Sequence, residues 1–156
     1  MPPRHDQFPN RVAAVRGFNR FYTRHLGLLK EGLYGSRFTL AEVRVLRELV
    51  FGTERTASGI GDALGMDRAF LSKILRRFEH DGLMRRSRAK HDGRQKVLSI
   101  TPRGRRAFAP LEVRADEQVG ALLSPMSSTE QRKLVQAMSL VKSLIERREH
   151  GTTAED

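Results

Sequence analysis

The stretch GMDRAFLSKILRRFEHDG, residues 65–82, carries the clearest pattern in the chain. Asp67 can accept a backbone N–H at the start of a helix, and Asp81-Gly82 can end that helix. Between them the apolar residues stand at i, i+3, i+4 and i+7, the spacing of one buried helical face: Leu71, Ile74, Leu75 and Phe78. The pattern predicts a helix whose opposite face presents Arg68, Ala69, Ser72, Lys73 and Arg76.

The segments on either side complete a larger motif. A short helix is predicted to start at Thr56 or Ser58 and to stop at Gly65, which gives two short helices joined by a tight turn, the helix-turn-helix arrangement. After it the apolar period changes, and residues 83–88 and 96–100 are predicted to be strands of a hairpin with Asp92-Gly93 in its turn. A basic hairpin that follows a helix-turn-helix indicates a winged helix-turn-helix, here residues 36–101.

Further helices are predicted on both sides of this domain. Apolar residues at spacings of three and four predict one from Asn10 to about Lys30, ended by Gly32 and Gly35. Thr39 and Glu42 form a capping box for the next helix.

On the C-terminal side, Thr101-Pro102 can start a helix in which Pro110 should introduce a kink or break one turn. Ser127 or Ser128 should cap the last helix, in which Leu134, Met138, Val141 and Ile145 repeat like a short heptad seam. The fold is therefore expected to be mainly α with a small β-hairpin wing, with dimerisation helices in residues 10–35 and 102–149 and flexible tails in residues 1–9 and 150–156.

Charge and composition restrict the function. The 156 residues include no cysteine, which excludes a disulfide framework and a thiolate zinc site. No apolar run approaches the roughly 18 residues of a membrane span, and the N-terminus lacks the apolar core of a signal peptide, so a cytoplasmic protein is expected. Residues 67–106 hold 13 of the 29 Lys and Arg but only four of the 18 acidic residues. Such a local positive field attracts a polyanion, and duplex DNA fits the motif.

The predicted DNA-binding residues lie on the second helix of the motif and on the hairpin. An α-helix fits the major groove, where Arg and Lys can donate to guanine and a serine hydroxyl can serve a base or a phosphate. An arginine at the tip of a hairpin can enter a narrow minor groove, and Arg94 is the candidate, oriented by Asp92. The candidate DNA contacts are Arg68, Ala69, Ser72, Lys73, Arg76, Arg86, Arg88, Lys90 and Arg94.

These residues resemble the MarR family of regulators. The resemblance is carried by the runs GMDRAFLSK (65–73), GLM (82–84), DGR (92–94) and LSITPRG (98–104), and it extends over about residues 10–149. It implies a homodimer with interlocked terminal helices, a palindromic operator and repression that a small ligand relieves. In the middle of the DNA-reading helix, here the helix predicted in residues 67–80, the family has a small polar residue, and Phe70 departs from that pattern. Residues 12–29 and 103–111 are most similar to members fused to a GNAT-type acetyltransferase, of which this chain could be the N-terminal regulatory module.

Dimerisation and ligand binding follow from the same interpretation. One reading helix with its wing covers one half-site, and a dimer places two copies one DNA turn apart. The candidate interface residues are Val12, Val15, Leu134, Met138, Val141, Leu144 and Ile145, each of which could instead belong to the core of one chain. The resemblance places an effector pocket near the first, second and fifth helices, with Phe18, Tyr22, His25 and Phe108 as candidates.

Two other classes of function are weighed against a DNA-binding regulator. The run GIGDALG (59–65) imitates a nucleotide-binding loop but does not follow a strand, and the five histidines show no metal-ligand spacing, so no enzyme, metal or cofactor is expected. A winged helix that binds protein or RNA is the other alternative. Basic residues on both the reading helix and the wing favour duplex DNA.

Overall fold

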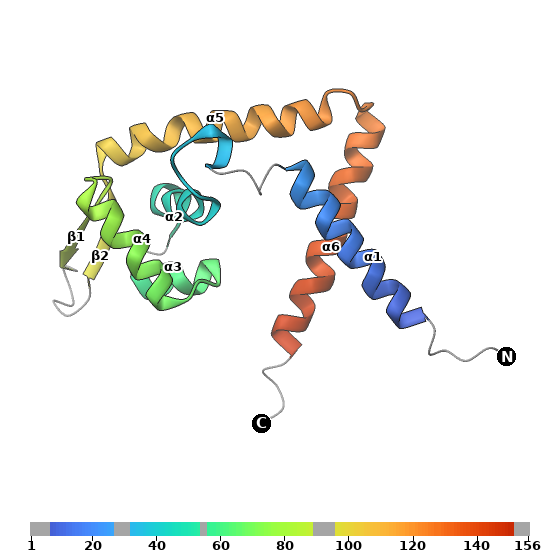
Figure 1. Ribbon diagram of the computed structural model, residues 1–156, viewed down its shortest axis with the longest axis horizontal. Coiled ribbons are helices and arrows are strands. Elements are labelled where there is room, and N and C mark those ends of the chain that lie inside the picture. The colour runs from blue at the N-terminus through green and yellow to red at the C-terminus, as the bar shows by residue number, and fades with distance from the viewer. Residues whose placement is uncertain (1–6, 27–31, 54–55, 89–95, 152–156) are drawn as a thin grey trace. The chain divides into compact units, whose positions relative to one another are not determined.

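The computed structural model describes residues 7–26, 32–53, 56–88 and 96–151. The described elements are α1 (Gln7–His25), the 3-10 helix η2 (Leu33–Gly35), α2 (Leu40–Phe51), α3 (Ala57–Leu64), α4 (Arg68–His80), β1 (Met84–Arg88), β2 (Lys96–Ile100), α5 (Pro102–Leu123) and α6 (Ser128–Gly151) (Figure 1). The chain divides into two units, residues 1–115 and residues 116–156. The order of elements confirms the predicted fold class.

Helices α2, α3 and α4 pack together with the hairpin around one core (Figure 1). Val45, Leu46, Ile60 and Phe78 are completely buried there. The two strands are antiparallel, with Met84 opposite Ile100 and Arg88 opposite Lys96. Because side chains alternate between the faces of a strand, Met84 and Leu98 point into this core while Arg85 and Ser87, on the opposite face, are exposed.

The predicted caps are present where the sequence places them. Thr39 and Glu42 form the capping box of α2, and the Thr101 hydroxyl accepts the Gly104 N–H at the start of α5. The Ser127 hydroxyl accepts the Glu130 N–H at the start of α6. These hydrogen bonds satisfy N–H groups that have no partner within a helix, so each helix begins at a defined residue.

A close approach holds the first turn of α5 against the hairpin. Gly104 is buried, and a Cβ added there would collide with the backbone carbonyl oxygen of Leu83 and with the Ile100 side chain. The Thr101 N–H and hydroxyl also donate to the Leu83 carbonyl, at 2.9 and 3.0 Å. Only glycine therefore fits at position 104.

The structure differs from the sequence predictions at the bounds of α1 and α6, and it lacks the break that was the alternative to a kink at Pro110 in α5. α1 begins at Gln7 and ends at His25, before the glycines that were expected to stop it. α5 runs without a break from Pro102 to Leu123 and contains Pro110, which is exposed. A proline can be accommodated in a helix when the freed carbonyl four residues earlier is reached by solvent, and Arg106 at that position is exposed. α6 also extends to Gly151, beyond the predicted start of the C-terminal tail.

Candidate nucleic-acid interface

The turn between α3 and α4 is built from three residues with separate tasks. Gly65 ends α3 in the left-handed conformation, with φ of 59°, which glycine adopts without steric cost. Met66 follows, and its N–H donates to the Gly61 carbonyl at 2.9 Å. Asp67 then caps α4 by accepting the Phe70 N–H at 3.0 Å. The start of α4 is thus held by local hydrogen bonds.

α4 has one buried face and one exposed, basic face. Leu71, Ile74, Leu75 and Phe78 are buried, as predicted. On the opposite side Arg68, Ala69, Lys73 and Arg76 are exposed and Ser72 is half-buried. The basic face is therefore open to a partner, and the role of these five residues in DNA binding remains a prediction.

The described part of the hairpin adds further cations beside α4. Arg86 is half-buried, whereas Arg88 and its strand partner Lys96 are exposed. Three of the residues proposed from the sequence, Lys90, Asp92 and Arg94, lie outside the described residues. Both strands of the wing are thus described, whereas the segment between them, residues 89–95, is not.

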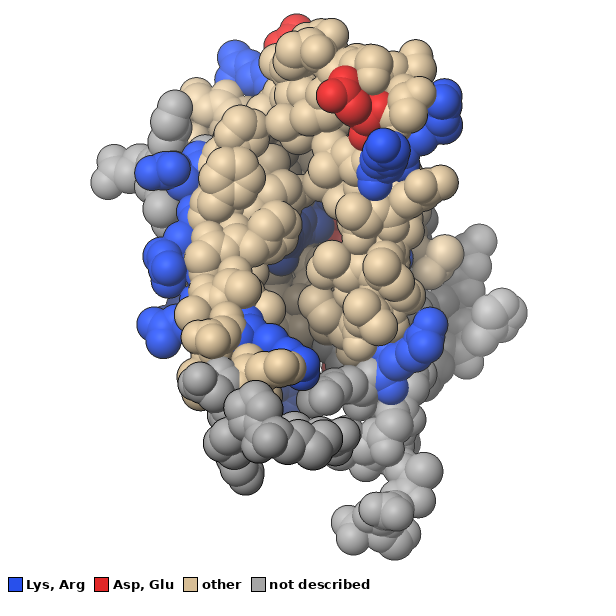
Figure 2. All heavy atoms as spheres, turned by 90° about the vertical axis from the view of Figure 1, so that its right-hand side faces the viewer, with Lys and Arg blue, Asp and Glu red and all other residues tan. Residues whose placement is uncertain are grey.

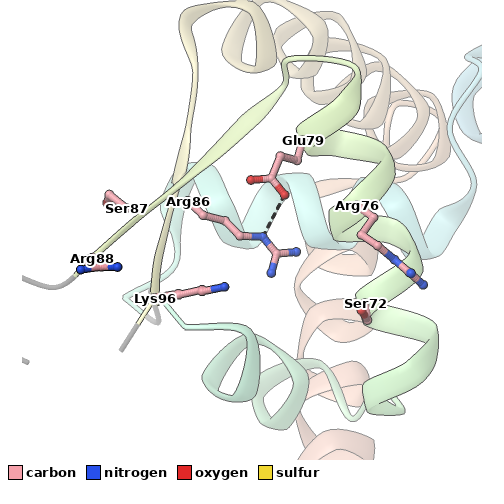
Figure 3. A pocket seen from close by; sticks show the side chains of 7 residues that line it. All are labelled: Ser72, Arg76, Glu79, Arg86, Ser87, Arg88 and Lys96. Carbon is pink, nitrogen blue, oxygen red and sulfur yellow. Dashed lines mark ion pairs between the residues drawn. The ribbon is translucent and has the colours of Figure 1, made fainter. Parts of the chain in front are cut away.

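A groove of about 420 Å³ separates α4 from the hairpin (Figure 3). Its lining residues, which come from both elements, are Ser72, Arg76, Glu79, Arg86, Ser87, Arg88 and Lys96. A second cavity of about 610 Å³ shares Ser72, Arg86 and Lys96 with it and reaches Thr56 and Ser58 at the start of α3. The two cavities therefore form one basic trough between the helix-turn-helix and the wing.

One ion pair spans this groove. Arg86 Nε lies 3.0 Å from Glu79 Oε2, and the two side chains point toward each other across the gap in Figure 3. The Nε atom is buried and its N–H makes no hydrogen bond with a described residue, so the contact with Glu79 is electrostatic. The pair holds the Arg86 guanidinium inside the groove. Arg86 was among the residues predicted from the sequence, whereas no sequence pattern pointed to Glu79.

A second pair fixes α4 to α2. The Glu42 carboxylate accepts from the Thr39 N–H at 2.9 Å and from the Thr39 hydroxyl at 3.2 Å, and its other oxygen accepts from Arg77 Nη1. Glu42 is only 5% exposed. At the end of α4, Arg37 pairs with Asp81 at 3.4 Å. The capping motif pointed to Glu42 but no sequence signal connected it to Arg77, which lies 35 positions away.

The terminal helices present apolar side chains that the described structure leaves exposed. Val15 on α1 is 60% exposed and Ile145 on α6 is 59% exposed. The other candidates for a dimer interface are exposed as well, apart from the half-buried Leu134: Val12, Met138, Val141 and Leu144. In Figure 2, each of these two helices, taken by itself, turns mostly residues other than Lys, Arg, Asp and Glu toward the viewer.

The candidate effector residues have different surroundings. Phe108 is buried in the core, where its ring meets that of Phe51 edge-on at 5.8 Å. Phe18 and Tyr22 stack on each other along α1, with ring centroids 5.5 Å apart, and His25 stacks on Phe21. An effector pocket among them stays a prediction.

Within the described ranges, no three His, Asp or Glu side chains come together in a way that could hold a metal ion. None of the described helices is both long enough and apolar enough to cross a membrane.

The fold and the basic trough define the class as a winged helix-turn-helix that has further helices before and after it in the chain. In agreement, residues 38–95 match the model of the MarR family. No curated protein matches the chain.

Solved structures extend this similarity over almost the whole chain. A probable transcriptional regulator from Pseudomonas aeruginosa is 26% identical, with a TM-score of 0.63, over 80% of this chain and 92% of that one. The PcaV transcriptional regulator from Streptomyces coelicolor is 26% identical, with a TM-score of 0.64, over 88% of this chain and 97% of that one. A MarR variant from E. coli complexed with operator DNA shares the fold, with a TM-score of 0.69 and 20% identity over 87% of this chain and 98% of that one.

Proposed function

We propose that this chain is a transcriptional regulator of the MarR family that binds DNA sequence-specifically, as a homodimer on a palindromic operator. The observation that carries the proposal is the exposed basic face of α4 beside the basic trough formed with the hairpin. An α-helix of this kind fits the major groove, and a basic hairpin beside it can reach the backbone or the adjacent minor groove.

In the proposed complex, α4, the two strands and the wing contact different parts of the DNA. Residues near the start of α4 read base edges, as helices in such motifs do, and the Arg and Lys side chains further along also reach phosphates. Arg86 and Arg88 contact the backbone from the strands, and in the wing Lys90 and Arg94 extend these contacts, with Asp92 orienting Arg94. The MarR variant complexed with operator DNA and a Staphylococcus aureus MepR–DNA complex support this use of the fold.

The proposed dimer follows from the geometry of a half-site and from the exposed terminal helices. One α4 with one hairpin covers one half-site, so high specificity needs a second copy one DNA turn away. α1 and α6 each carry exposed apolar residues that a second copy could cover. The double variant Leu134→Asp, Val141→Asp should therefore sediment as a monomer with little operator affinity. Dimers of this variant would show that the interface lies elsewhere.

Repression that a small ligand relieves is the form of regulation we propose. The PcaV regulator was solved with its natural ligand, and DNA binding by Bordetella bronchiseptica BpsR is regulated by 6-hydroxynicotinic acid. In this chain the candidates remain Phe18, Tyr22, His25 and Phe108. A screen of metabolites for release of the protein from bound DNA tests this part of the proposal.

DNA binding is tested with purified protein and the DNA upstream of its own coding sequence. The affinity should fall steeply as salt rises, because each phosphate contact releases counterions. In the double variant Lys73→Ala, Arg76→Ala the slope of log K against log salt should become shallower by up to about 1.8, or about 0.9 for each lost phosphate contact.

A control variant that loses the same number of cations from another helix distinguishes the loss of DNA contacts on α4 from the change in net charge. Arg132→Ala, Lys133→Ala removes two exposed cations from α6 and should leave the slope unchanged. Equal effects of the two double variants would mean that α4 has no special role, and preferential binding to a protein or to RNA would favour the alternative functions.

A further inference from the structure

α4 carries one large apolar side chain that the core does not bury. Phe70 is 48% exposed, whereas the other four large apolar residues of the helix are buried. Its ring makes no aromatic or cation–π contact with the described part of the chain. Contact between an apolar ring and water is unfavourable, so a partner that buried the Phe70 ring would gain binding free energy.

The backbone around Phe70 is held in place. Its N–H donates to the Asp67 carboxylate at 3.0 Å, so the residue lies in the first turn of a capped helix. At 3.6 residues per turn, Phe70 shares a flank of α4 with Lys73 and Arg77. Arg77 is tied to the buried Glu42, which anchors this flank to α2. The ring is thus offered from a fixed position near the end of the helix that comes closest to base edges.

The charges next to Phe70 indicate the chemistry of its partner. Lys73, three residues further along the same flank, is exposed and borders the basic face of α4, so an apolar protein surface laid on the ring would bury unpaired cations. A polyanion that also carries an apolar group could pair with the cations and bury the ring at the same time. In the major groove of duplex DNA that apolar group is the 5-methyl of thymine.

We propose that Phe70 is a specificity-determining residue that contacts a thymine 5-methyl group in each operator half-site. This inference rests on the proposed function. A phenyl ring neither donates nor accepts a hydrogen bond, so it distinguishes thymine from other bases by the methyl group alone. The contact adds a preference for thymine at one position to the hydrogen-bonded readout by Arg and Lys.

The test uses an operator fragment that the wild-type protein binds, in which each thymine is replaced in turn by deoxyuridine. This exchange removes one methyl group and leaves the Watson–Crick edge unchanged. For wild type, uracil at one symmetry-related position in each half-site should weaken binding about fourfold, the loss expected for one buried methyl group. In Phe70→Ala the same uracil should have no effect, and in Phe70→Leu, which keeps an apolar side chain, sensitivity should persist.

The outcomes separate this inference from the proposed function. Since Phe70 is half exposed, Phe70→Ala should keep the thermal stability of wild type, which a melting curve checks. Equal sensitivity to uracil in wild type and Phe70→Ala would overturn the inference, as would the absence of any sensitive position in wild type, while DNA binding itself would stand. If wild type bound no duplex DNA at all, both would fail.

Discussion

Glu42→Ala should destabilise the protein by about 2–4 kcal/mol, because Glu42 joins the cap of α2 to the helix that carries the basic face. The substitution removes the acceptor of the Thr39 N–H, of the Thr39 hydroxyl and of Arg77 Nη1. A neutral hydrogen bond contributes about 0.5–1.5 kcal/mol and one to a charged group about 1.5–3 kcal/mol. The Arg77 side chain is 45% exposed and can be rehydrated when Glu42 is removed. The expected loss is therefore smaller than the sum of the three hydrogen-bond contributions.

The magnitude is measured by urea unfolding at one fixed protein concentration, since a dimer's stability depends on concentration. Glu48→Ala, at a half-buried position on the same helix, is the matched control and should cost less than 1 kcal/mol. A double-mutant cycle with Arg77→Ala isolates the pair, whose coupling energy should be about 1–2 kcal/mol.

The same variant also tests the link between α2 and α4. If the pair orients α4, Glu42→Ala should weaken operator binding under conditions in which the variant remains folded. A loss of less than about 0.5 kcal/mol in stability, together with no coupling to Arg77, would refute the reasoning that a buried carboxylate holds these helices together.

Two further predictions concern the ends of α5 and α6. Gly104→Ala should destabilise the protein by about 1–3 kcal/mol or more, because the added Cβ would meet a backbone carbonyl that cannot move away. Gly120→Ala, on the same helix, adds a Cβ that meets nothing within 4 Å and should be neutral or stabilising. Thermal melts measure both variants, and equal melting temperatures would contradict this prediction. Hydrogen bonds from the Ser127 side chain and backbone lower the pKa of Glu130, so the charged cap is favourable above the ordinary carboxylate pKa and is lost as pH falls through the lowered value. Ser127→Ala should therefore raise the Glu130 pKa in an NMR titration, and an unchanged pKa would mean that the hydroxyl does not stabilise the carboxylate.

The elements that sequence predicted correctly are those specified by neighbours along the chain. Asp67 caps α4 through a residue three positions away, and Thr39 caps α2 in the same way. The buried stripe of α4 repeats with the helical period, so one buried residue indicates the next. Local rules of this kind also located the two strands and the start of α5.

The errors arose where local rules compete. Glycine can end a helix, but α1 stops at His25, before Gly32. Proline usually interrupts a helix, yet α5 continues through Pro110. Propensity is a weak prior that the rest of the structure can override.

By itself the sequence determined the winged helix-turn-helix, the basic side of its second helix and the apolar seam of α6. In each helix and strand the apolar residues recur with the period of that secondary structure, so the pattern can be read from neighbouring residues alone. Only the tertiary structure decided that Arg77 reaches Glu42, that Glu79 holds Arg86 within the groove and that Phe70 stays outside the core. These contacts depend on how separate elements pack, and the distance between two side chains in space does not follow from the number of residues between them.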